Sequence, residues 1–376
     1  MDMMRRVSLL ALLLCAVLSL PAFALEKQFD TGFLATWWGN DNDDTGTQLA
    51  IPIRAGIVNG DLNAQLLNAF VYTSVDPDIG SSESLSSFVD TKLNISYALK
   101  GRAPVDVLMG LGLNLPTGYT DFKTEELVLV SLPPELLPIS TFGEGFNVNP
   151  YLGIAKEWQQ TALGLGMGYL WRGDYDYSET LQDFDPGDVF TITAEGVYDF
   201  TDACRGKIFA EYADYGTDTL DGEDYYQDGS LMLIGIGAAY VLPSSRIDGS
   251  ITGISRSKAE YFTETGTPID KEKNYGDELH IDLMHTCFLD STTALRSHVN
   301  FLSMGENDYE KDSPFYNGGR MKFSLGGGME KDLSGALKGN ADLSLFTIKD
   351  RENWFHPGED YSYRGFILSA GLQMIF

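Results

Sequence analysis

The sequence of 376 residues predicts an all-β protein, a transmembrane antiparallel β-barrel of about 16 strands. Three observations lead to this fold class. Segments of about 10–13 residues alternate between apolar and polar side chains along most of the chain. The connections between these segments alternate between short and long. The final segment also alternates and ends on a terminal aromatic residue, Phe376.

Composition excludes several other classes of protein. The chain has 54 acidic and 26 basic residues, and a formal net charge of −28 is unsuited to neutralising nucleic-acid phosphates. Forty glycines and 12% aromatic residues are wrong for collagen, a helical bundle or a disordered chain. A mean hydropathy of −0.12 excludes a polytopic helical membrane protein, but it is compatible with strands that are only half apolar.

The amino terminus has the pattern of a secretion signal. Arg5 and Arg6 precede the apolar run Leu9–Leu20, and Ala22-Phe23-Ala24 resembles a cleavage site. We therefore expect residues 1–24 to be removed and residues 25–376 to form one barrel domain in the outer membrane of a Gram-negative-type bacterium. The remaining cysteines, Cys204 and Cys287, fall several strands apart, so we expect no disulfide between them.

The strands are defined by a periodicity of two. In Gln48–Val58, for example, Leu49 and Ile51 lie on the face opposite to Gln48 and Arg54. The same alternation defines Phe88–Leu99, Val105–Asn114, Leu163–Arg172, Arg320–Leu325 and the final segment Phe366–Phe376. Any one such segment is compatible with a soluble sandwich, but a sandwich rarely contains so many long strands in succession.

The connections favour the barrel, because outer-membrane barrels have short periplasmic turns and longer extracellular loops. Seven short turns are expected near Asn59–Asp61, Lys100–Ala103, Gln159–Gln160, Thr201–Arg205, Pro243–Arg246, Asp290–Thr293 and Asp332–Ala336. Eight long loops are expected near Gly39–Gly46, Val75–Ser86, Leu115–Phe146, Gly173–Pro186, Gly216–Asp228, Ala259–Gly276, Gly305–Asn317 and Lys349–Tyr361. Aromatic residues near the strand ends suggest interfacial girdles: Trp37, Trp38, Tyr72, Tyr97, Trp171, Tyr198 and Tyr240.

The long loops are strongly acidic. Together they hold 33 acidic and six basic residues, which accounts for almost the whole net charge. One interpretation is that the loops concentrate cations at the mouth of the barrel. The other is that they are soluble tips that share divalent cations with lipopolysaccharide.

Ionisable residues on the inward faces are expected in a wetted lumen, since charges facing lipid are costly. We predict twelve residues that line or constrict the pore: Arg54, Asp90, Lys92, Asp106, Glu125, Glu126, Glu135, Arg172, Glu195, Arg296, Arg320 and Lys322. Glycines at 164, 166 and 168 suggest that part of the inner wall carries nothing bulky.

The third loop, Leu115–Phe146, is the longest and is unusually apolar. We expect it to fold into the lumen and pack against the inner wall, with the lipid interface or a neighbouring subunit as alternatives. Its glutamates would then face Arg54, Lys92, Arg172 or Arg320 across a constriction.

Strand number, short turns and a long third loop together resemble the general diffusion porins. In addition, Gly112-Leu-Asn-Leu-Pro-Thr-Gly118 and Asn149-Pro-Tyr-Leu-Gly153 are similar to segments of the transporter-like barrels of phenol-degradation meta-pathways. The first resemblance implies a passive channel with an infolded third loop. The second implies an uptake channel for a small organic solute.

The sequence therefore predicts an outer-membrane porin for small hydrophilic solutes, with a preference for cations. The alternatives are a barrel that sheaths a periplasmic or multihaem cytochrome partner, and a substrate-specific uptake channel. No enzyme activity is expected, although a protease-like site at His356 in an acidic loop is conceivable. No cofactor is expected either, apart from a weak calcium-loop resemblance at Asp41 and Asp43. The expected partners are lipid, lipopolysaccharide and small solutes or ions, with a homo-oligomer and a periplasmic partner left open.

Overall fold

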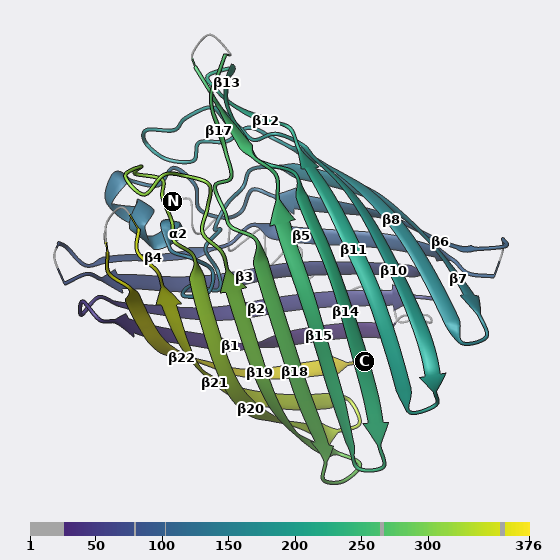
Figure 1. The fold of residues 1–376 in the computed structure, drawn as a ribbon. Coiled ribbons are helices and arrows are strands. Elements are labelled where there is room, and N and C mark those ends of the chain that lie inside the picture. The colour runs from purple at the N-terminus through teal and green to yellow at the C-terminus, as the bar shows by residue number, and fades with distance from the viewer. Residues whose placement is uncertain (1–25, 79, 102, 264–266, 354–357) are drawn as a thin grey trace.

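The computed structural model describes residues 26–78, 80–101, 103–263, 267–353 and 358–376. Its strands form a closed antiparallel barrel of 16 strands, drawn in Figure 1. The first strand, β1 (Glu26–Asn40), pairs with the last, β22 (Tyr361–Ile375), and this pairing closes the ladder. The predicted signal peptide and its cleavage site lie outside the described residues, as does His356.

The wall strands follow one another around the barrel in chain order, each antiparallel to the next. After β1 they are β2 (Thr45–Asn59), β3 (Leu62–Asp76), β4 (Glu83–Phe88) with β5 (Thr91–Leu99), β6 (Asp106–Leu115), β7 (Asn147–Trp158), β8 (Thr161–Arg172), β10 (Val189–Thr201), β11 (Cys204–Tyr215), β14 (Leu231–Leu242), β15 (Ser245–Arg256), β18 (Glu278–Phe288), β19 (Thr293–Met304), β20 (Arg320–Ser334) and β21 (Leu337–Asp350).

The fourth position in the wall is shared by two short strands. Both β4 and β5 pair with β3, β4 along one half of it and β5 along the other. Val89 and Asp90 separate them, and the backbone N–H of Asp90 donates to the carbonyl of Phe142 in the third loop. The wall is therefore interrupted at the point where this loop is attached.

The predicted alternation of short and long connections is confirmed. Several turns hold only two residues, as at 60–61, 159–160 and 243–244, whereas the connection between β6 and β7 spans residues 116–146. We refer to residues 116–146 as the inner loop. It contains two helical segments, η1 (Thr124–Leu127) and α2 (Val128–Ser131). Among the described residues, no helix is long and apolar enough to cross a bilayer.

The outer face of the barrel is apolar. Leu49, Ile51, Leu165 and Met167 are among many large apolar side chains that stay exposed on it, and this is the surface a lipid-facing wall needs. Trp37, Trp171, Tyr198 and Tyr240 are also exposed. The girdle prediction is wrong for Trp38, which is buried and lies across Gly46, because neighbouring residues on a strand face opposite sides.

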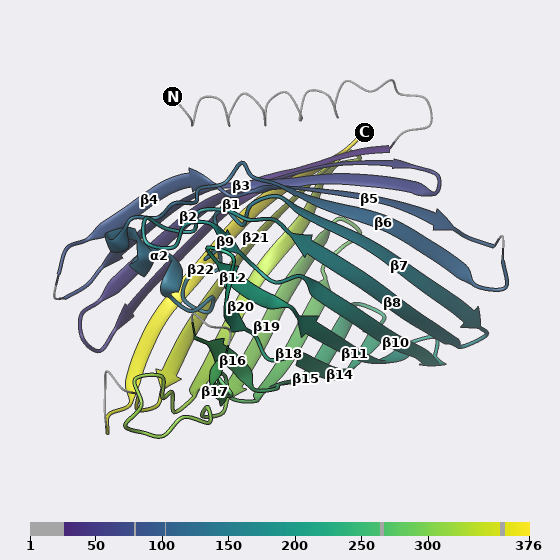
Figure 2. The ribbon, with the colours of Figure 1, turned by 90° about the horizontal axis from the view of Figure 1, so that it is seen from above.

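The hydrophobic core lies inside the barrel, between the inner loop and the wall. Leu129, Leu136, Leu137 and Phe142 of the inner loop are fully or almost fully buried. They pack with inward-facing wall residues, namely Trp38, Ala50, Ala69, Val71, Val75, Leu85, Phe346 and Ile348. Figure 2, seen from above, shows α2 on the inner side of β3 and β4.

The long loops also form a second, smaller sheet that we did not predict. Its strands are β9 (Phe184–Asp185), β12 (Thr217–Leu220), β13 (Glu223–Gln227), β16 (Ala259–Phe262) and β17 (Pro268–Glu272). The sheet stands at the loop end of the barrel in Figure 1 and links three successive loops.

Candidate transport pathway through the barrel

Several of the predicted lumen residues form ion pairs on the inner wall. Arg54 lies 3.7 Å from Asp30, and Arg296 contacts Glu330. Arg320 pairs with Asp350 at 2.6 Å. These basic side chains are thus largely neutralised by carboxylates on adjacent strands.

Asp90 is placed differently from the prediction. Its side chain is only 3% exposed, so it lies beneath the inner loop and not on the water-facing wall. Oδ1 accepts from the backbone N–H of Gly118, and Oδ2 accepts from the N–H of Glu144 and from Asn114 Nδ2, all at 2.7 Å. One carboxylate thereby fixes both ends of the inner loop, because Gly118 and Glu144 lie near its start and finish.

The middle of the inner loop is held at Glu135. Its carboxylate accepts from Arg320 at 2.8 Å, and its carbonyl accepts from Lys322 Nζ at 3.1 Å. The carboxylate of Glu144 lies 3.7 Å from Lys92 Nζ. Inner-loop glutamates therefore meet two of the basic residues named from sequence, Lys92 and Arg320, in direct contact and not across an open gap.

Polar and apolar contacts fix the same segment to β2. The side chain of Gln48 is buried, donates to the carbonyl of Ile139 at 2.7 Å and accepts from the N–H of Ile139 at 2.9 Å. A buried side chain that pairs with a loop backbone in both directions satisfies groups that would otherwise be costly to bury. The inner loop is thus docked against the wall by its own backbone as well as by its leucines.

Glu125 and Glu126 lie at the start of the helical segment. Glu125 is exposed. Glu126 accepts from the Tyr119 hydroxyl at 3.0 Å and from the backbone N–H of Lys123 at 3.1 Å. Burial, together with the hydrogen bond to Glu126, raises the pKa of Tyr119 to about 12.

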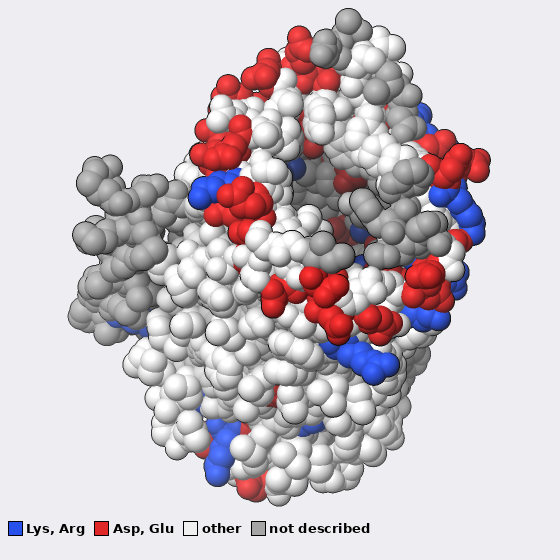
Figure 3. Space-filling view, turned by 90° about the vertical axis from the view of Figure 1, so that its left-hand side faces the viewer, with Lys and Arg blue, Asp and Glu red and all other residues white. Residues whose placement is uncertain are grey.

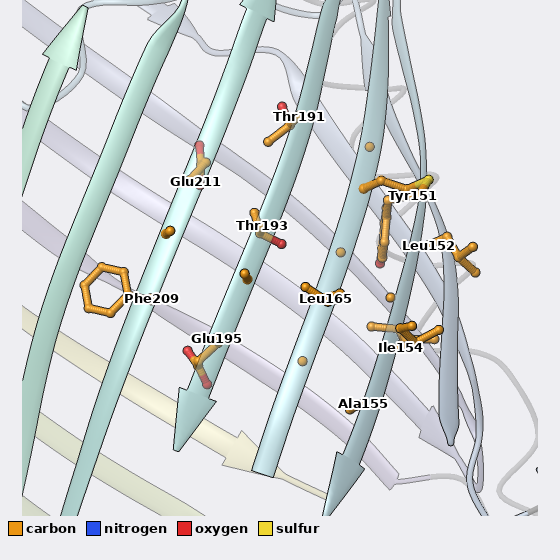
Figure 4. A pocket seen from close by; sticks show the side chains of 18 of the residues that line it. Tyr151, Leu152, Ile154, Ala155, Leu165, Thr191, Thr193, Glu195, Phe209 and Glu211 are labelled. Carbon is orange, nitrogen blue, oxygen red and sulfur yellow. The ribbon is translucent and has the colours of Figure 1, made fainter. Parts of the chain in front are cut away.

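The opposite part of the wall is open. A hollow of about 930 Å³ lies along β7, β8, β10 and β11, and Glu195 is among the residues that line it (Figure 4). Asp106 also belongs to its lining. Gly164, Gly166 and Gly168 lie side by side with Glu195, Thr193 and Thr191 in the strand register. Arg172 ends β8 above them, and its backbone N–H donates to Asp188 at 2.9 Å.

A second hollow of about 530 Å³ continues along β11, β14, β15, β18 and β19. Its lining is more polar and is made by Arg205, Lys207, Arg246, Asp248, Asp282, His298 and Asn300, among others. Here Arg246 pairs with Asp248, and Asn300 donates to Asp282 at 2.6 Å. The alternation of side chains along a strand gives no indication that this side of the wall is uncovered.

The mouth of the barrel is acidic. Figure 3 shows aspartate and glutamate side chains around a hollow at the loop end and an almost uncharged band below them.

The loops at this rim are joined to one another. Phe122 of the inner loop donates its backbone N–H to the carbonyl of Tyr177, and β12 and β13 extend the connection through the small sheet.

The remaining candidate sites are simple to place. Cys204 and Cys287 are both free thiols, on β11 and β18. Asp41 accepts from the backbone N–H of Ser362 at 3.2 Å, and Asp43 has a φ of 66° in the turn after β1. The described residues contain no group of three or more metal-ligating side chains. A calcium site at Asp41 and Asp43 stays a prediction.

A closed antiparallel barrel with an apolar outer face, a charged inner face and short turns at one end is a transmembrane β-barrel of the outer-membrane type. No family model matches the sequence, and no curated protein matches it either.

Three solved structures are similar to this chain over most of its length. An anion-selective porin from Comamonas acidovorans is 11% identical, with 94% of this chain and 99% of that chain covered and a TM-score of 0.43. An outer membrane channel from Pseudomonas putida F1 is 12% identical, with 95% and 97% covered and a TM-score of 0.43. The monoaromatic hydrocarbon channel TodX, as a deletion mutant, is 11% identical, with 96% and 94% covered and a TM-score of 0.46.

Proposed function

We propose that this protein is a passive outer-membrane channel for small hydrophilic solutes. The observation that supports this best is the uneven lumen. The inner loop covers the wall around β1–β4 and β21, whereas the wall from β7 to β19 borders two hollows whose linings include charged and small residues beside apolar ones. A barrel of 16 strands is wide enough for an aqueous path when only part of it is filled.

We further propose that the channel prefers cations. The acidic rim supports this preference, because a mouth lined by one sign of charge raises the local concentration of counter-ions. Basic residues in the lumen oppose a preference for cations. Their effect is reduced because Arg54, Arg296 and Arg320 each face a carboxylate.

A sheath around a cytochrome has less support than a channel. The inner loop is docked on the wall at Asp90, Gln48 and Glu135, so it occupies the surface that an enclosed partner would contact. The loops at the mouth remain the expected contact with lipopolysaccharide.

Solute permeation into liposomes tests the proposed function. Liposomes with the purified protein should swell in isotonic sugars and amino acids, at rates that fall steeply as solute size increases. Heat-modified migration in gels should confirm a folded barrel in the same sample. Liposomes that contain folded barrel and stay as tight as protein-free liposomes would overturn the proposal.

A further inference from the structure

The second hollow, of about 530 Å³, is lined by charged side chains of both signs. Arg205, Lys207 and Arg246 are basic, and Asp248 and Asp282 are acidic. They come from β11, β15 and β18, which follow one another around the wall with β14 between the first two (Figure 1). The charge that this hollow presents to a solute depends on which of these groups already neutralise one another.

Both arginines are paired with a carboxylate. Arg205 donates to the two oxygens of Asp199 through Nε and Nη2, at 2.5 and 3.0 Å. Arg246 contacts Asp248 in the same way, with Nη2 at 2.6 Å from Oδ1. Such two-point contacts fix the guanidinium and neutralise its charge locally. The arginines therefore contribute little net charge to the hollow.

One ammonium and one carboxylate remain, those of Lys207 and Asp282. Within the described part of the chain, neither forms an ion pair. Asp282 accepts from Asn300 at 2.6 Å, and Lys207 Nζ lies 4.9 Å from the centroid of the Phe209 ring. An amide and an aromatic face orient a charged group without cancelling its charge. Both side chains are exposed, so they can contact a solute in the hollow.

The two groups stand on either side of a floor of small residues. Lys207 is opposite Gly237 in the ladder, Gly237 is opposite Ser250, and Ser250 is opposite Asp282. Three strand spacings of about 4.8 Å each separate Lys207 from Asp282 at the backbone. The side chain of Lys207 lies across Gly237, on the side toward Asp282, because the glycine leaves room for it. We call this arrangement the Lys207–Asp282 row.

A positive and a negative group on opposite sides of a hollow favour one kind of solute. A zwitterion can direct its carboxylate to Lys207 and its ammonium to Asp282, and it then gains from both contacts. A simple amine is attracted by Asp282 but repelled by Lys207, and the opposite holds for a simple carboxylate. The separation across the floor requires that the charges of the solute lie at its two ends.

We propose that the Lys207–Asp282 row is a binding site for small zwitterions, that is, amino acids with the ammonium and the carboxylate at opposite ends. This deepens the proposed channel function and rests on it for the transport of such solutes. Binding does not depend on conduction, so the site and the channel can be tested separately.

The test uses 4-aminobutyrate as the probe, with butyrate and butylammonium as counterparts that carry only one of its charges. Radiolabelled 4-aminobutyrate should bind to the detergent-solubilised mature barrel in a scintillation proximity assay, and unlabelled 4-aminobutyrate should compete. Butyrate and butylammonium should not compete at the concentration at which the unlabelled zwitterion halves the signal. Heat-modified migration in gels confirms that each sample is folded.

Variants locate the site. Asp282→Asn and Lys207→Gln should each raise the Kd of 4-aminobutyrate about tenfold, as expected when one charge-assisted contact is lost. Each should also change the preference of the site, because one unopposed charge remains. Asp282→Asn should bind labelled butyrate, and Lys207→Gln should bind labelled butylammonium. Neither change is expected to unfold the barrel, since both side chains are exposed.

Glu211→Gln is the matched control. Glu211 lies on the same strand as Lys207 but lines the larger hollow, so its loss should change the Kd of 4-aminobutyrate less than about twofold. An effect as large as that of Asp282→Asn would overturn the proposal, because general lumen charge would then explain binding.

Two further results would contradict the site. One is competition by butyrate or butylammonium as strong as that by 4-aminobutyrate, and the other is an unchanged Kd in Asp282→Asn or Lys207→Gln. A barrel that makes liposomes permeable but binds no 4-aminobutyrate contradicts the site and leaves the channel standing. A barrel that binds 4-aminobutyrate but leaves liposomes tight contradicts the channel and leaves the site standing.

Discussion

Asp90 illustrates at the scale of a single residue how the chain keeps its longest loop inside. A buried carboxylate is costly unless its oxygens are hydrogen-bonded, and here both oxygens are used. Two of the three donors are backbone N–H groups of the inner loop itself. The carboxylate is therefore satisfied only when the inner loop is docked.

Asp90→Asn tests this role with little change in volume. The asparagine keeps one oxygen for Gly118 but presents an NH₂ group to the donors from Glu144 and Asn114. Each hydrogen bond lost at a buried donor costs about 1–3 kcal/mol, so docking of the inner loop should weaken by at least that order. Limited trypsin digestion should cleave after Lys123 about tenfold faster than in the unchanged protein.

The control for this variant is Asp282→Asn, where the lumen carboxylate accepts from Asn300 and touches no loop backbone. It should be digested at the rate of the unchanged protein. Equal rates for all three proteins would show that Asp90 does not hold the inner loop.

The alternation of side chains predicts which residues face the lumen, but it does not predict their surroundings. Alternation alone predicts Arg54, Glu195 and Arg320 on the inward face; in the structure Arg54 and Arg320 form ion pairs, and Glu195 lines the larger hollow. It gives no depth along the barrel and no information on what covers a position. For that reason Asp90 was expected on the water-facing wall, although it lies under the inner loop.

At the scale of elements, the inner loop should be removable without loss of the barrel. The strand ladder is closed by β1 and β22, and it does not depend on residues 116–146. Deletion of Lys123–Thr141 removes α2 and the buried leucines from the lumen. Single-channel conductance should therefore rise clearly, while the barrel keeps its heat-modified migration in gels.

The same deletion distinguishes other roles of the loop. Unchanged conductance with loss of an oligomer would mean that the segment links subunits. No change in either property would mean that it lies at the lipid interface, in contradiction to its contacts with Gln48 and Val71.

The small outer sheet marks the limit of element prediction here. Its strands have two to five residues and lie within acidic loops, where alternation is too short to detect. The sequence contains one signal for part of this sheet, a hairpin turn between two of its strands. Asp221-Gly222 is a preferred hairpin turn, and both residues have positive φ, 53° and 79°, between β12 and β13.

At the scale of the whole molecule, charge and topology are separated. The strands and turns build a nearly neutral barrel, whereas the loops carry almost all of the net charge of −28. Strand number and connection pattern could be predicted because lipid imposes one repeated length and one alternation on every strand. The uneven filling of the lumen could not be predicted from the sequence, because it depends on which part of the wall the inner loop covers.

The charge separation predicts selectivity that depends on salt. Loop charges act through solvent, and the screening length falls from about 10 Å at 0.1 M to about 3 Å at 1 M. The reversal potential under a salt gradient should indicate cation preference at low ionic strength and approach zero preference in molar salt. Anion preference at low salt would show that lumen residues, and not the loops, set selectivity.

Conductance of the purified protein in planar bilayers tests the central claim most directly. If the uncovered side of the lumen is an aqueous path, single insertions should produce steady steps of current that rise linearly with voltage. The step size should increase when Lys123–Thr141 is deleted. A correctly folded barrel that inserts and stays silent, with or without the deletion, would contradict the account.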